Sequence, residues 1–138
     1  MSDNPNVQTL KAAYQAWIES RGTETKGWIE AVHPDVRMAS LAAGKDGPGI
    51  RPLERGTNAV VQYLDDVMAH WVMQHFRVDR YVGEGDAVAA IIDCAWTNRS
   101  TKRTYHGRMA HCWTFRDGKI ASFEEFLDTA DLIAAATP

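Results

Sequence analysis

A period-two alternation of side chains in residues 104–116 constrains the fold of this chain more than any other feature. Aromatic and apolar side chains dominate one set of alternate positions, which holds Tyr105, Gly107, Met109, His111, Trp113 and Phe115. This alternation is typical of a strand with one face in a core. The run Arg116-Asp117-Gly118 predicts a tight turn, and residues 119–127 predict a return strand. The chain therefore carries a hairpin whose core face includes one histidine.

The length of that turn decides which glutamate shares a face with His111. A two-residue turn at Asp117-Gly118 puts Glu124 opposite His111. A three-residue turn, with Gly118 in a left-handed bulge, puts Glu125 on the face of His111. Both turns tolerate this sequence, and the neighbours of Glu125 are only slightly more core-like, so the residues leave both alternatives open.

Apolar spacing predicts helices in the first half of the chain and strands in the second half. Three helices are expected, running from Pro5 to Gly22, from Thr25 to Pro34 and from Thr57 to Trp71. Strands are expected at residues 36–40, 75–82, 87–98, 104–116 and 119–127, and a last short helix at 129–136. This order predicts an α+β fold, with three N-terminal helices packed on one face of a mostly antiparallel sheet.

Residues 42–52 combine glycines and prolines too densely for regular structure. Such a segment provides a lid or a pocket rim, or it is a loop without a role in function.

Length and charge exclude several classes of protein. The 138 residues fit one domain, 1–138, that can build a core of its own. A net charge of −3 with scattered basic residues predicts no nucleic-acid partner and no membrane partner. The polar start and the isolated Cys94 and Cys112 predict a cytoplasmic protein with free thiols. No histidine spacing or nucleotide motif predicts a metal or a cofactor.

The strand at residues 87–98 is apolar on both faces, and three helices can cover only one face of a sheet. We expect the other face to pack against a second subunit, which makes the protein a homodimer. The residues assigned to that outer face are Ile92, Cys94, Trp96, Ala110 and Cys112.

The ending WTFRDGKIASFEEFLDTADL, together with three N-terminal helices, a glycine-rich loop and a long meander, resembles the nuclear transport factor 2-like superfamily. Within it, the chain is most similar to the SnoaL-like polyketide cyclase branch. The resemblance implies a cone-shaped roll with a pocket at its wide end and dimers that pack through the sheet. It also favours the three-residue turn, which places Glu125 inward.

Two relatives in this superfamily suggest positions for chemistry. Similarity to limonene epoxide hydrolase implies that its water-activating aspartate falls on Glu125 and its second aspartate on Asp93. Its water-holding asparagine falls on Ser40. Similarity to ketosteroid isomerase places the general-base slot again on Ser40, and the two oxyanion-hole positions near Tyr14 and on His111.

Three ionisable side chains are therefore expected to line one cavity: Asp93, His111 and Glu125. Pocket walls are expected from Tyr14, Met38, Ser40, Trp71, Trp113 and Phe123. Carboxylates and an imidazole in an apolar pocket are typical of acid/base catalysis. We assign Glu125 as the base, Asp93 as its partner or the acid, and His111 as a donor to a developing oxyanion.

A purely structural interpretation exists for each of these residues. His111 is then a hydrogen-bonded core residue, Asp93 pairs with His111 or Arg108, and Glu125 faces solvent. The leading functional hypothesis is a cofactor-independent isomerase, cyclase or hydrolase with a pocket for a small, largely apolar molecule. The alternatives are a non-catalytic module that binds such a ligand and a structural dimerisation module.

Overall fold

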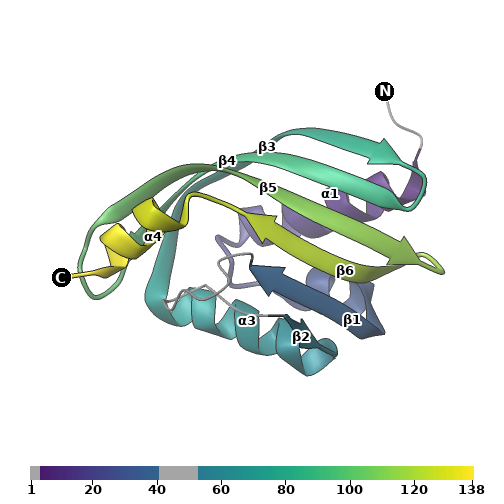
Figure 1. Cartoon of the computed structure of the whole chain (residues 1–138), viewed down its shortest axis with the longest axis horizontal. Coiled ribbons are helices and arrows are strands. Elements are labelled where there is room, and N and C mark those ends of the chain that lie inside the picture. The colour runs from purple at the N-terminus through teal and green to yellow at the C-terminus, as the bar shows by residue number, and fades with distance from the viewer. Residues whose placement is uncertain (1–3, 41–52) are drawn as a thin grey trace.

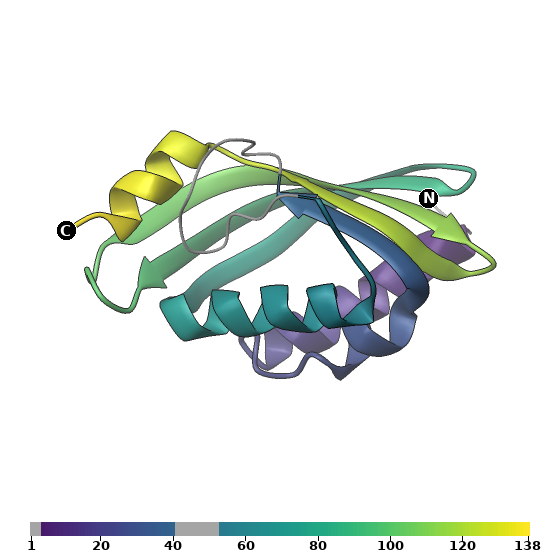
Figure 2. The same ribbon diagram turned by 60° about the horizontal axis from the view of Figure 1, so that its bottom comes forward.

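Within residues 4–40 and 53–138, which the computed structural model describes, a curved six-stranded sheet covers three helices (Figures 1 and 2). The helices are α1 Pro5–Glu19, α2 Lys26–Ala31, α3 Thr57–His70 and α4 Thr129–Ala136. No helix in these two ranges is long and apolar enough to span a membrane. The segment 42–52, with its expected lid or rim, lies outside the described residues.

The strands follow the order β2-β1-β6-β5-β4-β3 across the sheet. Their bounds are β1 Val32–Ser40, β2 Glu54–Arg55, β3 Trp71–Glu84, β4 Ala87–Asn98, β5 Thr104–Arg116 and β6 Lys119–Phe126. Every pair is antiparallel except β1 with β6. Helices α1, α2 and α3 lie on the concave face, so the predicted α+β roll on a mostly antiparallel sheet is confirmed (Figure 2).

Helix α1 begins and ends at residues with clear capping chemistry. The Asn4 side chain accepts a hydrogen bond from the backbone N–H of Asn6, and Pro5 occupies the first helical position. The helix ends at Glu19, about one turn before the predicted end at Gly22, which adopts a left-handed φ of 88°. The backbone N–H of Gly22 bonds to the Trp17 carbonyl and closes the last turn.

Two predicted boundaries were wrong. Helix α2 ends at Ala31, and β1 starts at Val32 and runs through Pro34, which was expected to stop the helix. The ladder of β1 with β6 is irregular between Val32 and Arg37, so Pro34 sits where no regular ladder bond is required of it. Strand β3 starts at Trp71, directly after α3, and not at residue 75.

The β5–β6 turn has two residues, so the favoured three-residue turn was wrong. Asp117 and Gly118 have φ values of 53° and 76°, as a type I′ turn requires. The ladder then shifts, because Phe115 pairs with Ile120 while Thr114 pairs with Ser122, and Ala121 is left as an extra residue.

This bulge determines the face on which each glutamate lies. Beyond Ala121, His111 pairs with Glu125, and Glu124 pairs with Cys112 on the opposite face. The prediction that Glu125 shares a face with His111 is therefore confirmed, although the turn that was expected to cause it is absent.

The register between β4 and β5 corrects the predicted outer face. Ile92 pairs with Met109 and Trp96 pairs with Tyr105, which places the Ile92, Cys94 and Trp96 side chains in the core under the helices. Ala110 and Cys112 lie on the other face with Asp93. The cause is the connection at residues 99–103, which pairs even-numbered positions of β4 with odd-numbered positions of β5.

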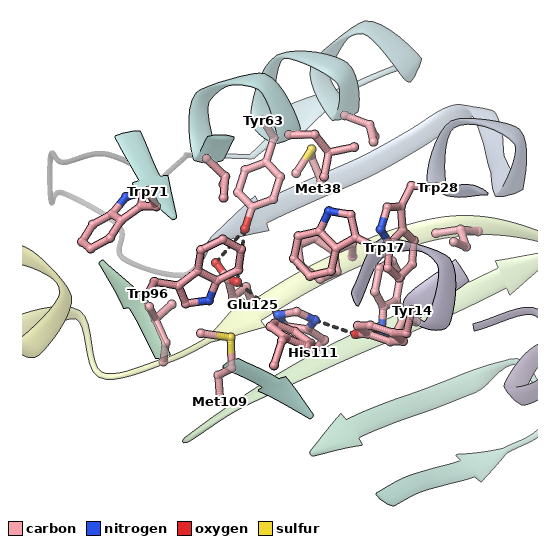
Figure 3. A pocket seen from close by; sticks show the side chains of 18 of the residues that line it. Tyr14, Trp17, Trp28, Met38, Tyr63, Trp71, Trp96, Met109, His111 and Glu125 are labelled. Atoms are coloured by element: carbon pink, nitrogen blue, oxygen red, sulfur yellow. Dashed lines mark hydrogen bonds and ion pairs between the residues drawn. The ribbon is translucent and has the colours of Figure 1, made fainter. Parts of the chain in front are cut away.

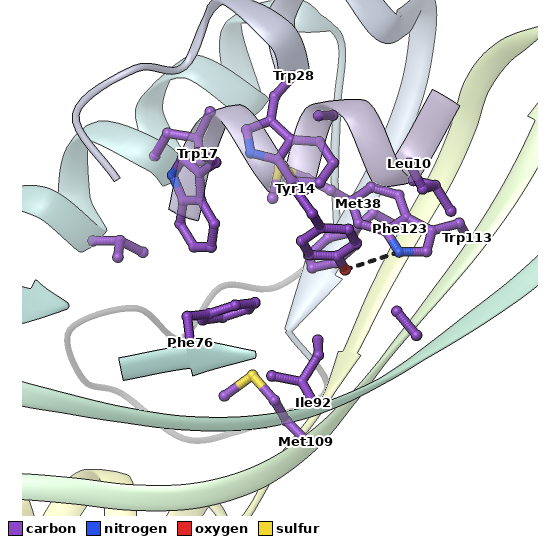
Figure 4. Close-up of a cluster of buried hydrophobic side chains, with 14 of the residues drawn as sticks. Leu10, Tyr14, Trp17, Trp28, Met38, Phe76, Ile92, Met109, Trp113 and Phe123 are labelled. Carbon is purple, nitrogen blue, oxygen red and sulfur yellow. Dashed lines mark hydrogen bonds between the residues drawn. The ribbon is translucent and has the colours of Figure 1, made fainter. Parts of the chain in front are cut away.

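Aromatic side chains fill the space between the N-terminal helices and the sheet (Figure 4). Trp28 from α2 stacks on Trp113 from β5 with ring centroids 5.1 Å apart. Trp17 meets Phe76 edge to face at 5.0 Å, and Tyr14 meets Trp28 in the same way at 4.8 Å. These contacts fix α1 against β3 and α2 against β5, and they hold the wall of the adjoining cavity.

Candidate functional site

A cavity of about 90 Å³ lies between the concave face of the sheet and the helices (Figure 3). Each helix and each strand except β2 contributes to its lining. Of the predicted pocket walls, the structure brings together Tyr14, Met38, Trp71, Trp113 and Phe123. Ser40 is the last residue of β1, and its backbone pairs with Glu125 in the parallel ladder. The structure describes the backbone of Ser40 but not its side chain.

Glu125 and His111 form a hydrogen-bonded pair in the lining of this cavity. The Nε2 atom of His111 lies 3.1 Å from Oε2 of Glu125, and both residues are 6 % exposed. On the other side of the imidazole, Nδ1 lies 2.6 Å from the Tyr14 hydroxyl. The indole N–H of Trp113 donates to the same hydroxyl at 3.2 Å. Four buried side chains therefore form one continuous chain of hydrogen bonds.

Tyr63 of α3 supplies a further partner that the sequence analysis missed. Its hydroxyl donates to Glu125 and lies 3.1 Å from Oε1 and 3.2 Å from Oε2 (Figure 3). Tyr63 is three residues after Val60 and four before Val67, so the helical period already placed it on the apolar face of α3. That spacing was the available signal.

The chemistry of the donors fixes the direction of the hydrogen bonds at both ends of this chain, from Trp113 and from Tyr63. An indole N–H only donates, so the Tyr14 oxygen accepts from Trp113, and the Tyr14 hydroxyl also bonds to Nδ1 of His111, where the tautomer of the imidazole decides which atom donates. The other ring nitrogen of His111, Nε2, lies against Oε2 of Glu125 and donates to it when it carries a proton. Tyr63 donates to Glu125 from the other side, so both oxygens of this carboxyl group have a hydrogen-bond partner.

Burial keeps the two phenols in their protonated, donating form. Removal from water raises the pKa of Tyr14 well above its ordinary value, and the hydrogen bond from Trp113 only partly opposes this. Removal from water also raises the pKa of Tyr63, and the nearby Glu125 carboxylate raises it further. Both hydroxyls therefore keep their proton at neutral pH.

Asp93 does not belong to this site, which corrects its predicted role. It lies on the outer face of β4, between Arg77 of β3 and Arg108 of β5. Its Oδ2 atom is 3.4 Å from a guanidinium nitrogen of each arginine, and His75 lies 3.5 Å from Oδ1. The structural interpretation, in which Asp93 pairs with Arg108, is the correct one.

The resulting cavity is apolar except for a few polar groups. Among the lining residues that the structure describes, Glu125 is the one acid, and neither lysine nor arginine contributes. One carboxylate and one imidazole fall short of the donor set that a protein metal site needs. A carboxylate surrounded by aromatic and aliphatic side chains can take a proton from a bound molecule, because water does not compete for it.

Comparison with known proteins identifies a family. The family model of the SnoaL-like domain matches residues 10–123 of this chain. No curated protein sequence matches the chain.

Solved structures share its fold. An NTF2-like protein from Burkholderia thailandensis is 23% identical, with a TM-score of 0.83 over 99% of this chain and 100% of that one. TerC, co-crystallised with polyporic acid, is 23% identical, with a TM-score of 0.78 over 96% of this chain and 98% of TerC. An LEH-like epoxide hydrolase from Mycobacterium tuberculosis is 14% identical, with a TM-score of 0.70 over 96% of this chain and 89% of that one. At these identities the likeness is one of fold.

The tyrosines predict how stability depends on alkaline pH. Burial raises the pKa of each of Tyr14, Tyr63, Tyr81 and Tyr105, in the case of Tyr81 to about 12. In the unfolded chain, tyrosines ionise near pH 10. Above that pH the unfolded chain releases protons that the folded chain retains, so the free energy of unfolding must fall as pH rises. The fully buried Tyr14 contributes at most about 1.4 kcal/mol per pH unit.

The prediction is checked by measuring the free energy of unfolding in urea at pH values below and above about 10, with tyrosinate absorbance recorded in parallel. We expect absorbance to rise only as the protein unfolds. Tyrosinate formation near pH 10 in a chain that keeps its native circular dichroism would contradict the burial of these phenols.

Proposed function

The chain belongs to the SnoaL-like domain family, and from its cavity we propose that it is a cofactor-independent acid/base enzyme acting on a small, largely apolar molecule. The observation that carries this proposal is the hydrogen-bonded carboxylate of Glu125 in a cavity without another charged side chain among the described residues. Glu125 is the base. Tyr63 and His111 are positioning residues, because their hydrogen bonds fix the orientation of both carboxylate oxygens.

The position of Asp93 favours an isomerase or a cyclase over a hydrolase. Epoxide opening of the kind that the resemblance implied uses a second carboxyl group beside the water-activating one. Asp93, the residue expected to supply it, lies on the outer face of the sheet with Arg77 and Arg108. Proton abstraction from the bound molecule requires only the one carboxylate that lines the cavity.

A small carbon acid tests Glu125 as a base without knowledge of the substrate. Nitroethane exchanges its CH₂ protons for deuterium when a base removes one proton and leaves the electron pair on the nitronate. We expect the protein in deuterium oxide to accelerate this exchange over an equal concentration of acetate by about 10²-fold or more. The readout is the loss of the CH₂ signal by proton NMR.

Neighbouring glutamates provide the matched controls for this experiment. Glu125→Gln keeps the shape of the side chain and should return the exchange rate to background. Glu124→Gln alters the exposed neighbour on the opposite face and should leave the rate unchanged. A Glu125→Gln protein that retains the full rate would exclude Glu125 as the base, and a wild-type rate equal to that of acetate would favour a ligand carrier.

For the assembly, we propose a homodimer through the outer face of the sheet. The outward positions of β4 and β5 include Ile91 and Ala110, which pair with each other, and the nearby Phe126 is 44% exposed. Apolar side chains on this face would be buried by a second copy. Sedimentation velocity should show a dimer at micromolar concentration, and a protein that sediments as a monomer there would contradict the proposal.

A further inference from the structure

Another hollow of the molecule lies on the outer face of the sheet, away from the apolar cavity. Three arginines from three strands line it: Arg37 of β1, Arg55 of β2 and Arg116 of β5. The next residue of β1, Met38, is buried in the core, so the alternation of the strand turns Arg37 outward. We call this site, defined by its three guanidinium groups, the arginine hollow.

Two of these arginines stand directly opposite each other. Arg37 and Arg55 are partners in the antiparallel ladder of β1 and β2. The side chains of ladder partners lie on the same face of the sheet, with Cβ atoms about 4.5–5.5 Å apart. Two positive charges at this separation repel each other. An anion that accepts hydrogen bonds from both guanidinium groups converts the repulsion into attraction.

The backbone around Gly56 holds Arg55 in this place. The N–H of Gly56 donates to the carbonyl of Val36 at 2.7 Å, which ties the chain after β2 to β1. Gly56 has a φ of 92°, in the left-handed region that favours glycine, and it is the N-cap of α3. The position of Arg55 opposite Arg37 is therefore set by the backbone before any ligand binds.

Arg116 is held at the side of the hollow by residues near the start of β1. Its guanidinium group lies 3.5 Å from the Asp35 carboxylate and 2.8 Å from Nε2 of His33, and both of these residues also line the hollow. Asp35 offsets the charge of this one arginine, whereas the ladder pair adds two more positive charges. A guanidinium group has more N–H donors than these two contacts use, so Arg116 can also donate to a bound anion.

The donors of the arginine hollow suit a phosphate group. The planar fork of a guanidinium group bonds to two oxygens of one phosphate at once, a geometry that a lysine ammonium cannot provide. The volume of about 500 Å³ is that of a small-molecule site and exceeds the need of a single ion. From these observations we infer that the arginine hollow binds a phosphate group, either as free phosphate or as part of a small phosphate ester.

This site is separate from the proposed base and from the proposed dimer contact. Val36 and Met38, on either side of Arg37 in β1, line the apolar cavity, so the strand itself lies between the two sites. Ala110, in the proposed dimer contact, is about 20 Å from Arg116 along the extended strand β5. Phosphate binding in the arginine hollow is therefore independent of whether Glu125 acts as a base.

Titration with inorganic phosphate tests the site, with the Nε–H NMR signals of Arg37 and Arg55 as local reporters. Sodium chloride keeps the ionic strength constant, because salt alone weakens contacts between charges. We expect saturable shifts of both signals that fit one bound phosphate. Phenyl phosphate then separates the two sources: tighter binding than inorganic phosphate supports an ester, and equal or weaker binding supports free phosphate. The absence of saturable shifts with either compound would overturn the inference.

Variants assign the binding to the ladder pair. Arg37→Gln and Arg55→Gln change exposed side chains, and each should weaken phosphate binding by at least about fivefold. Arg80→Gln removes the same charge from an exposed position of β3, at the opposite edge of the sheet from β2, and should keep the affinity within about twofold. An equal loss in all three variants would indicate a general effect of net charge, and unchanged affinity in Arg37→Gln and Arg55→Gln would place the phosphate elsewhere. Either result would contradict the proposed site.

Discussion

The hydrogen bonds to the Glu125 carboxylate are the interaction on which the site depends. They come from Tyr63 on α3 and His111 on β5, and the imidazole is held in turn by Tyr14 on α1. A hydrogen bond to a charged group contributes about 1.5–3 kcal/mol, and leaving a buried partner unsatisfied costs a similar amount. Helices α1 and α3 and the β5–β6 hairpin, which are distant from one another in sequence, must therefore assemble together before this carboxylate can be buried.

The fold supports that assembly through one irregularity in β6. A regular hairpin with the type I′ turn at Asp117-Gly118 would place Glu124, and not Glu125, beside His111. The extra residue Ala121 reverses the faces of all residues that follow it. The same bulge leaves Glu124 in solvent, so a single extra residue decides which of the two glutamates enters the cavity.

Periodicity in the sequence was sufficient to predict most elements and several of the site residues. It placed His111 with Trp113 on a core face and predicted the bounds of β4, β5 and α4 correctly. It did not reveal the bulge at Ala121, because a bulge leaves no mark in a short apolar strand. It also misplaced Asp93, since the face of β4 depends on how the connection at residues 99–103 sets the register with β5. Membership of the SnoaL-like family and the nuclear transport factor 2-like fold is confirmed, whereas that resemblance placed both Glu125 and Asp93 in the cavity, and only Glu125 lines it.

The central claim is that Glu125 is the base, which requires a neutral His111 that donates from Nε2 to an ionised carboxylate, and nitrogen-15 NMR of the imidazole tests it most directly. At neutral pH we expect one protonated nitrogen, Nε2, and one unprotonated nitrogen, Nδ1, with the latter accepting from Tyr14. Two protonated ring nitrogens would show an imidazolium that already balances the carboxylate, and the account of Glu125 as the base of an apolar cavity would then be wrong.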